Sequence, residues 1–113
     1  MIIYNTTLVK FLTLGRIQKG GITIFPFIFL TTNMKKDNKI DIIINHEKIH
    51  IRQQLELLII PFYILYFLNY IINRCKGLDD NNAYLNIIFE KEAYNNQKDL
   101  DYLNTRKIFG WIR

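Results

Sequence analysis

The chain has 113 residues, of which half are hydrophobic and 22% are charged. This composition excludes an intrinsically disordered chain, and the length predicts a single domain, residues 1–113. The net charge of +5 comes from scattered basic residues without the interleaved aromatic side chains of a single-strand-binding surface, so no nucleic acid is expected as a partner.

The first part of the chain, residues 1–40, is expected to be rich in β-strand. Residues 6–14 mix β-branched and apolar side chains, and residues 22–30 are an almost continuous run of strand-forming residues. Because Pro26 lacks a backbone N–H, we expect strand 22–30 to lie at a sheet edge or to be bulged there. A polar loop, residues 31–39, follows.

The second part, residues 41–113, is expected to be helical. Asp41 can cap the first helix and Gly77 can end the second. Residues 78–82 are expected to form a loop before a third helix, and Asp99 can cap a last one. The predicted helices cover residues 41–60, 61–75, 84 to about 95, and 99–111. The predicted fold is therefore α+β, with a short N-terminal β-hairpin or meander packed on three to four helices.

The longest apolar run is Leu57–Ile72, with 16 residues. A membrane-spanning helix needs about 20 residues, so this run is too short to span a bilayer. We predict a buried core helix; the alternative is an interfacial or membrane-embedded helix, with Arg74 and Lys76 following it. The N-terminus shows no signal-peptide pattern, and the expected location is cytoplasmic, with or without membrane association.

The chemistry of the chain centres on the sequence HExxH, formed by His46, Glu47 and His50. Histidines four residues apart lie on one face of a helix, so both imidazoles can reach a single ion. The chain has only two histidines, and both belong to this motif. This pattern predicts a Zn²⁺ site in which Glu47 can act on a water molecule held by the metal.

A catalytic zinc ion usually has three protein ligands. Because no third histidine exists, we expect the third ligand to be a carboxylate further along the chain. Glu90 is the first choice, since it lies among apolar residues of a predicted helix, and Glu92 is the alternative. The other candidates considered are Asp79, Asp80, Asp99 and Asp101.

HExxH followed by the segment Glu90-Lys91-Glu92-Ala93-Tyr94 resembles the gluzincin metallopeptidases. It is similar in particular to prenyl-protease-like and antibiotic-sensor membrane peptidases and to small bacterial HExxH proteins. The resemblance implies a minimal zincin-like fold, with His46, His50 and Glu90 as zinc ligands and Glu47 as general base. Strand 22–30 also resembles the edge strand along which these enzymes align an extended substrate, and the alternative is an ordinary core strand.

The segment departs from those peptidases at Tyr94, where they usually carry an aspartate that orients a ligand histidine. Tyr84, Tyr94 and Arg106 are the candidates for a second group that stabilises the oxyanion.

The expected function is a zinc-dependent metallopeptidase that hydrolyses peptide bonds of a peptide or protein substrate with a metal-activated water. The alternative is a small non-catalytic protein that binds a metal or a membrane and serves as an interaction module. The sequence predicts neither the substrate nor the oligomeric state.

Overall fold

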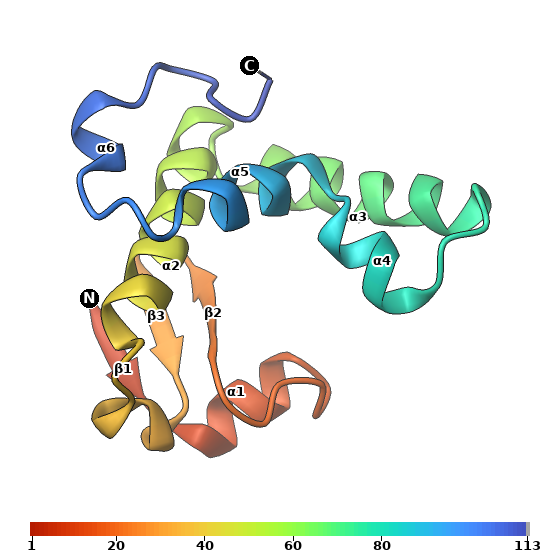
Figure 1. Ribbon diagram of the computed structural model, residues 1–113. Coiled ribbons are helices and arrows are strands. Elements are labelled where there is room, and N and C mark those ends of the chain that lie inside the picture. The colour runs from red at the N-terminus through yellow and green to blue at the C-terminus, as the bar shows by residue number, and fades with distance from the viewer. Residues whose placement is uncertain (113) are drawn as a thin grey trace.

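The computed structural model describes residues 1–112, which form a small sheet at the N-terminal end followed by a series of helices (Figure 1). This arrangement confirms the predicted α+β class. Helix α2 (Ile40–Glu56) lies between the sheet and helix α5 (Ile88–Asn96), and α3 (Ile60–Cys75) extends away from both.

The sheet has three strands, β1 (Ile2–Tyr4), β2 (Gly21–Ile24) and β3 (Phe27–Leu30), in the order β1-β3-β2. Strand β3 pairs antiparallel with β2 and parallel with β1, so the sheet is mixed. The predicted continuous strand 22–30 is wrong, because residues 22–30 fold into a hairpin. Pro26 lies in its turn, where the missing N–H removes no hydrogen bond from the sheet.

The strand predicted over residues 6–14 is also wrong, because the chain forms helix α1 (Thr6–Leu12) there. Asn5 caps this helix, its Oδ1 accepting from the backbone N–H of Leu8 at 2.9 Å. Val9 is fully buried. Tyr4, the last residue of β1, and Gly21, the first of β2, both lie next to Leu30, so α1 and the segment after it join two strands at the same end of the sheet. Helix α1 packs on β2 and β3, and this packing outweighs the β-propensity of the segment.

The helical part follows the expected order with different boundaries. Asp41 lies in the first turn of α2, and Lys39 takes the cap position without a side-chain hydrogen bond. The loop expected at residues 78–82 is shortened, because Asp79 caps a helix that begins at Asp80. The last predicted helix, 99–111, is reduced to a single turn. The remaining elements are η1 (Thr32–Lys36), α4 (Asp80–Leu85) and α6 (Tyr102–Thr105).

Two small apolar clusters form the core on either side of α2. One lies against the sheet and contains Ile28, Leu30 and Met34. The other joins α3 to α5 through Phe62 and Phe89, whose ring centroids are 4.7 Å apart.

A buried ion-pair cluster fastens the C-terminal segment to α2 and α5. The guanidinium of Arg106 donates to both carboxylate oxygens of Glu56 at 2.8 and 2.9 Å and also to Glu92. Burial alone would raise the pKa of both carboxyls, but their hydrogen bonds from Arg106 outweigh it and hold each pKa below the ordinary value. The cluster therefore fixes the distance between the two helices that carry the histidines and Glu90.

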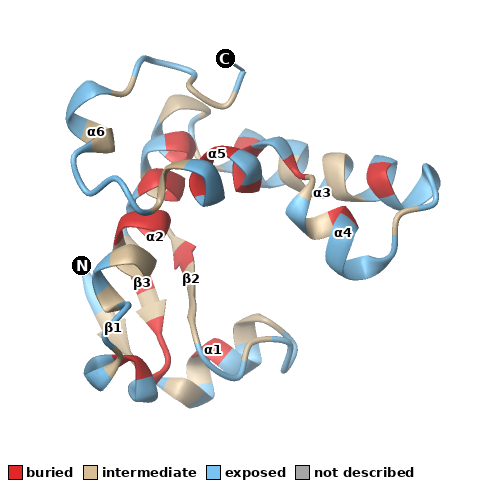
Figure 2. Ribbon diagram, viewed as in Figure 1, coloured by how far each residue is buried: buried red, intermediate tan, exposed pale blue. Residues whose placement is uncertain are grey.

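The prediction that Leu57–Ile72 forms a buried core helix is wrong. Within α3 only Phe62 and Asn73 are buried, and most of the helix is exposed (Figure 2). None of the described helices taken singly has the length and apolar character of a membrane span, whereas α2 and α3 together meet that test only across a 113° bend.

Candidate metal centre

His46 and His50 lie one turn apart on α2, and both are buried. Their Nε2 atoms are 3.2 Å apart and point toward the same place. The packing of α2 between sheet and α5 removes this face from solvent, so the two imidazoles occupy an interior position.

Glu90, from the first turn of α5, completes the group. Its Oε1 lies 3.1 Å from the Nε2 of His46 and 3.1 Å from the Nε2 of His50. The carboxylate is also buried, at 4% exposure. Among the described residues these three side chains form the one cluster of histidine, cysteine and acidic groups that could hold a metal ion.

The three ligand atoms form a nearly equilateral triangle. Bonds of about 2.0–2.1 Å to a tetrahedral zinc ion place neighbouring ligand atoms about 3.3 Å apart, close to the separations observed here. Two neutral nitrogens and one carboxylate oxygen are also a donor set that zinc accepts. The same donors suit other divalent transition metals, so the geometry fits zinc without selecting it.

The acidic side chains beside His50 favour its positively charged, protonated form. Burial alone would lower the pKa of His50, but Glu90, and to a lesser extent Glu47, raise it to about 9. The same interactions hold the pKa of Glu90 well below its usual range, although burial opposes this. Glu90 is therefore ionised at neutral pH, and the site provides a buried negative charge for a cation.

Two glutamines orient the histidines. The Nδ1 of His46 lies 2.8 Å from the Oε1 of Gln97, and the Nδ1 of His50 lies 2.8 Å from the Oε1 of Gln53. In the neutral imidazoles, an Nδ1–H that donates to each carboxamide oxygen leaves the Nε2 lone pair free to bind a metal, and at His50 the metal would displace the proton that its raised pKa favours. The amide of Gln53 is itself fixed, donating to the backbone oxygen of Phe89 at 3.0 Å.

Tyr94 takes a different role from the aspartate that it replaces in the resembled peptidases. Its ring meets the ring of His46 edge to face, with centroids 4.5 Å apart, and its hydroxyl lies 3.1 Å from that of Tyr84. The Nδ1 of His46 instead has Gln97, at the C-terminal end of α5, as its hydrogen-bond acceptor. No sequence signal distinguishes Gln97, whereas Gln53 follows His50 by three residues and so lies on the same face of α2.

Glu47 lies beside the cluster on the side of the sheet. Its Oε2 accepts from the hydroxyl of Thr23 at 2.8 Å, and both residues are buried. Gly21 on β2 has no room for a side chain. A Cβ placed there would lie 3.5 Å from the Oε1 of Glu47 and 2.4 Å from a side-chain carbon of Leu30. Strand β2 therefore packs closely on Glu47, and the hydrogen bond from Thr23 orients its carboxylate. The sequence did not indicate this role of Thr23.

A cavity of about 710 Å³ opens onto the cluster. Glu47, Tyr84 and Tyr94 line it together with the two histidines and Glu90. Its other walls come from β2, α3 and the segment that follows α1. The hydroxyl of Tyr66 donates to the Oε2 of Glu90 at 2.5 Å and so occupies the carboxylate oxygen that faces away from the histidines.

The three tyrosines remain protonated at neutral pH, because burial raises the pKa of Tyr66, Tyr84 and Tyr94. Each hydroxyl can therefore donate a hydrogen bond. Those of Tyr84 and Tyr94 belong to the cavity wall, where a substrate oxygen could receive one.

The other acidic candidates lie elsewhere. Glu92 is held by Arg106 and by the hydroxyl of Tyr102, at 2.6 Å. Arg106, a candidate oxyanion donor from the sequence, instead donates to Glu56 and Glu92 in this ion-pair cluster. Asp79 caps α4, Asp80 pairs with Arg16, and Asp99 accepts from the backbone of Asp101.

Strand β2 lies at the sheet edge next to α2, but half of its outer edge is occupied. The carbonyl of Thr23 accepts from the Nε2 of Gln54 and from the hydroxyl of Tyr63, at 3.1 and 3.0 Å. The N–H of Phe25 donates to the Oε1 of Gln54 at 2.9 Å. An extended peptide could pair only with the part of β2 that precedes the Thr23 carbonyl.

Comparisons of this chain with protein-family models, with curated proteins and with solved structures found no match.

Proposed function

We propose that the chain is a minimal zinc-dependent metallopeptidase of gluzincin type. The observation that carries this proposal is the triangle of His46 Nε2, His50 Nε2 and Glu90 Oε1, with sides of 3.1–3.2 Å, beside a buried glutamate and an open cavity. In this proposal His46, His50 and Glu90 would hold the ion and Glu47 would act as general base.

A bound zinc ion would make a water molecule acidic enough to ionise near neutral pH and would polarise the substrate carbonyl. Glu47 would take the proton from that water as its oxygen attacks the carbonyl carbon, and would pass it to the nitrogen of the amine that leaves. The C–O bond forms first and leaves negative charge on the former carbonyl oxygen; the C–N bond then breaks as its nitrogen receives the proton. The hydrogen bond from Thr23 would keep the Glu47 carboxylate turned toward the cavity.

Tyr84 and Tyr94 hydrogen-bond to each other, and the hydroxyl of the pair whose proton is free would stabilise the negative charge that develops on the carbonyl oxygen. Removing one such donor typically costs about 100-fold or more in kcat. Their place in the cavity wall supports this assignment, whereas Arg106 is engaged with two carboxylates.

The test is a comparison of wild type with Glu47→Gln on an unfolded protein substrate, together with metal analysis of both. We expect about one zinc per chain in each protein and chelator-sensitive cleavage by wild type, with kcat at least about 100-fold lower in the variant. Thr105→Ala, at an exposed position remote from the site, is the matched control. Equal cleavage by Glu47→Gln would contradict the role of Glu47 as general base.

The second candidate function is a non-catalytic module that binds the metal for stability. The occupied half of the β2 edge favours it, because Gln54 and Tyr63 already take the carbonyl of Thr23 that a substrate could use. This candidate predicts bound metal in wild type and no chelator-sensitive cleavage of any unfolded substrate.

A further inference from the structure

Helix α3 has its more apolar side turned outward. Toward the protein it presents polar as well as aromatic side chains: Phe62, Tyr66, Asn69, Tyr70 and Asn73. Toward solvent it presents mainly hydrophobic ones, of which six are 39–62% exposed: Ile64, Leu65, Phe67, Leu68, Ile71 and Ile72. This distribution is the reverse of a water-facing surface helix.

The outward face is wide and continuous. At about 100° per residue, these six exposed hydrophobic positions of α3 cover roughly 160° of its circumference. A single partner helix contacts a narrower stripe, so a helix from another copy would leave much of the face in water. An apolar medium would surround the exposed half of α3 and would therefore cover the whole apolar face.

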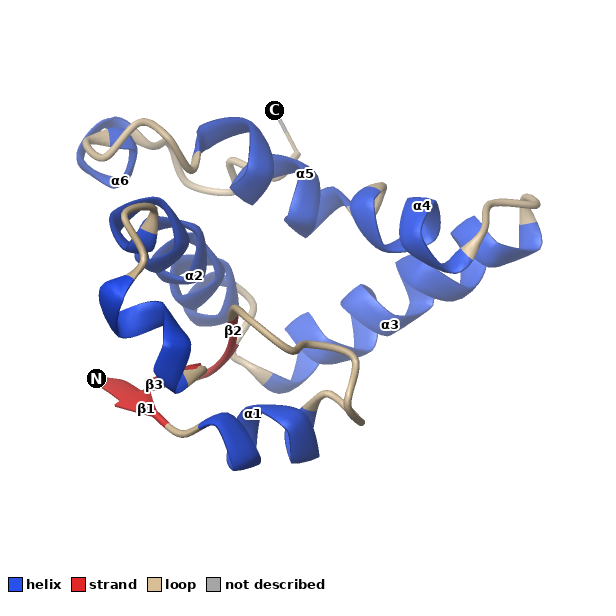
Figure 3. Ribbon diagram, turned by 60° about the horizontal axis from the view of Figure 1, so that its bottom comes forward, coloured by secondary structure: helices blue, strands red, loops and turns tan. Residues whose placement is uncertain are grey.

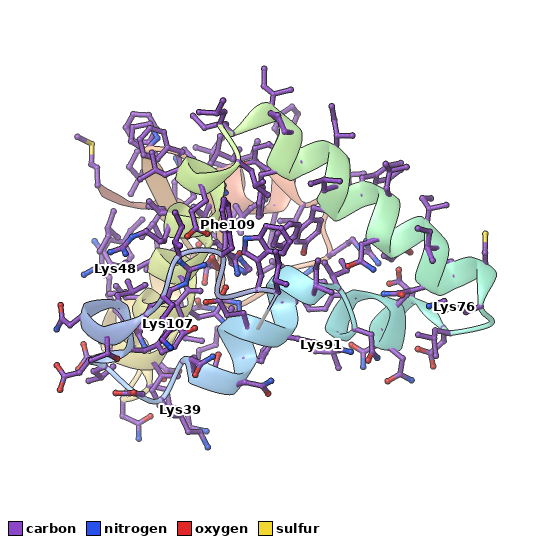
Figure 4. The ribbon with its side chains drawn as sticks, turned by 90° about the horizontal axis from the view of Figure 1, so that it is seen from above. Lys39, Lys48, Lys76, Lys91, Lys107 and Phe109 are labelled. Atoms are coloured by element: carbon purple, nitrogen blue, oxygen red, sulfur yellow. The ribbon has the colours of Figure 1, made fainter. Side chains whose placement is uncertain are left out.

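The charges around α3 favour an anionic occupant. No acidic residue occurs from Leu57 to Leu78, and Arg74 and Lys76 follow the apolar face. In Figure 4 the side chains of α3 project away from the rest of the molecule, with Lys76 at the end of the helix. Basic side chains beside an apolar helix face can reach lipid phosphates while the apolar residues enter the bilayer boundary.

The apolar face extends to the neighbouring segment after α1. Leu14, 89% exposed, and Phe67, 62% exposed, line the same cavity. Figure 3 shows α1 and α3 along the same side of the molecule. Exposed apolar side chains of both segments therefore border this cavity.

We propose that the outward face of α3 docks on the surface of a bilayer that contains anionic lipid, with the helix lying along the interface. Ile64, Phe67 and Leu68 enter the region between headgroups and acyl chains, and Arg74 and Lys76 contact lipid phosphates. This docking does not depend on the metal centre, whose ligands come from α2 and α5.

The experiment is flotation of the full chain with mixed phosphatidylcholine–phosphatidylglycerol vesicles. We expect wild type to float, and the triple variant Ile64→Gln, Phe67→Gln, Leu68→Gln to bind at least about tenfold more weakly, because three apolar side chains no longer enter the bilayer. Binding to pure phosphatidylcholine vesicles should also be weaker than to the mixture. Circular dichroism verifies that the variant is folded, which is expected since the replaced side chains are exposed.

The matched control is Leu100→Gln, Ile112→Gln, which replaces two exposed apolar residues outside α3. It should float like wild type. His46→Ala should float as well, which separates this proposal from that of the metal centre. Unchanged flotation of the triple variant, no flotation of wild type, or a dimer that forms without lipid and is lost in the triple variant would overturn the proposal.

Discussion

At the residue scale, the histidine nitrogens that face away from the proposed metal determine how well the site is organised. Gln97 and Gln53 hold the Nδ1 atoms of His46 and His50, each at 2.8 Å. A carboxamide fixes the ring and its tautomer without adding a negative charge. The carboxylate of Glu90 therefore supplies the one full charge of the proposed ligand set.

Replacing Gln97 tests this arrangement. Gln97→Ala should lower zinc affinity about tenfold or more, because the ring of His46 loses the acceptor that fixes its tautomer. Gln97→Glu retains an acceptor and should recover most of the affinity. Competition with a chromophoric chelator measures both, with Asn95→Ala on the same helix as control. If Gln97→Ala and Asn95→Ala bind zinc alike, Gln97 does not position His46.

At the element scale, the ion-pair cluster of Arg106 connects α2, α5 and the C-terminal segment. The side chains of Arg106, Glu56 and Glu92 are 1%, 6% and 3% exposed. Removing one partner of such a buried group leaves an uncompensated charge. The cluster should therefore stabilise the folded chain only while all three charged side chains are present.

Arg106→Met should lower the free energy of unfolding by about 3–5 kcal/mol, because two buried carboxylates lose their cation. Chemical denaturation at neutral pH measures the change. Lys107→Met, the neighbouring basic residue, is the control and should change stability little. A loss equal to that of Lys107→Met would contradict the structural role of the cluster.

The same cluster predicts acid sensitivity. The pKa values of Glu56 and Glu92 are lowered in the folded chain from the ordinary value of 4.5. Their contribution to stability is therefore fully present above about pH 4.5 and is lost as the pH falls through the folded-state pKa values. Unfolding measured across this range should show a steeper decline in wild type than in Glu56→Gln, Glu92→Gln. Parallel pH profiles would contradict the prediction.

At the scale of the whole molecule, the proposed metal would join two helices that otherwise share a small core. Its ligands come from α2 and from α5. Glu90 is 44 residues from His46 and 40 residues from His50 in sequence. A ligand that binds only the folded state stabilises it, by about 2.7 kcal/mol at a concentration one hundred times its Kd.

Zinc should therefore raise the melting temperature of the metal-free chain, and a chelator should reverse the increase. Scanning calorimetry with and without zinc measures the shift. His50→Ala is the control and should melt at the same temperature under both conditions. An equal zinc effect on wild type and His50→Ala would place the binding elsewhere on the chain.

The sequence by itself determined the α+β class, the helix that carries HExxH and the residues proposed as ligands, because these depend on local patterns: apolar periodicity and the spacing of His46, Glu47 and His50. Long-range contacts decided the rest. Helix α1 replaced the expected strand because it packs on β2 and β3, with its Val9 buried. Gln97 and Thr23 reached His46 and Glu47 through packing between elements distant in sequence. The exposure of α3 also depends on tertiary structure, since hydrophobic composition alone does not distinguish a buried helix from one that faces outward.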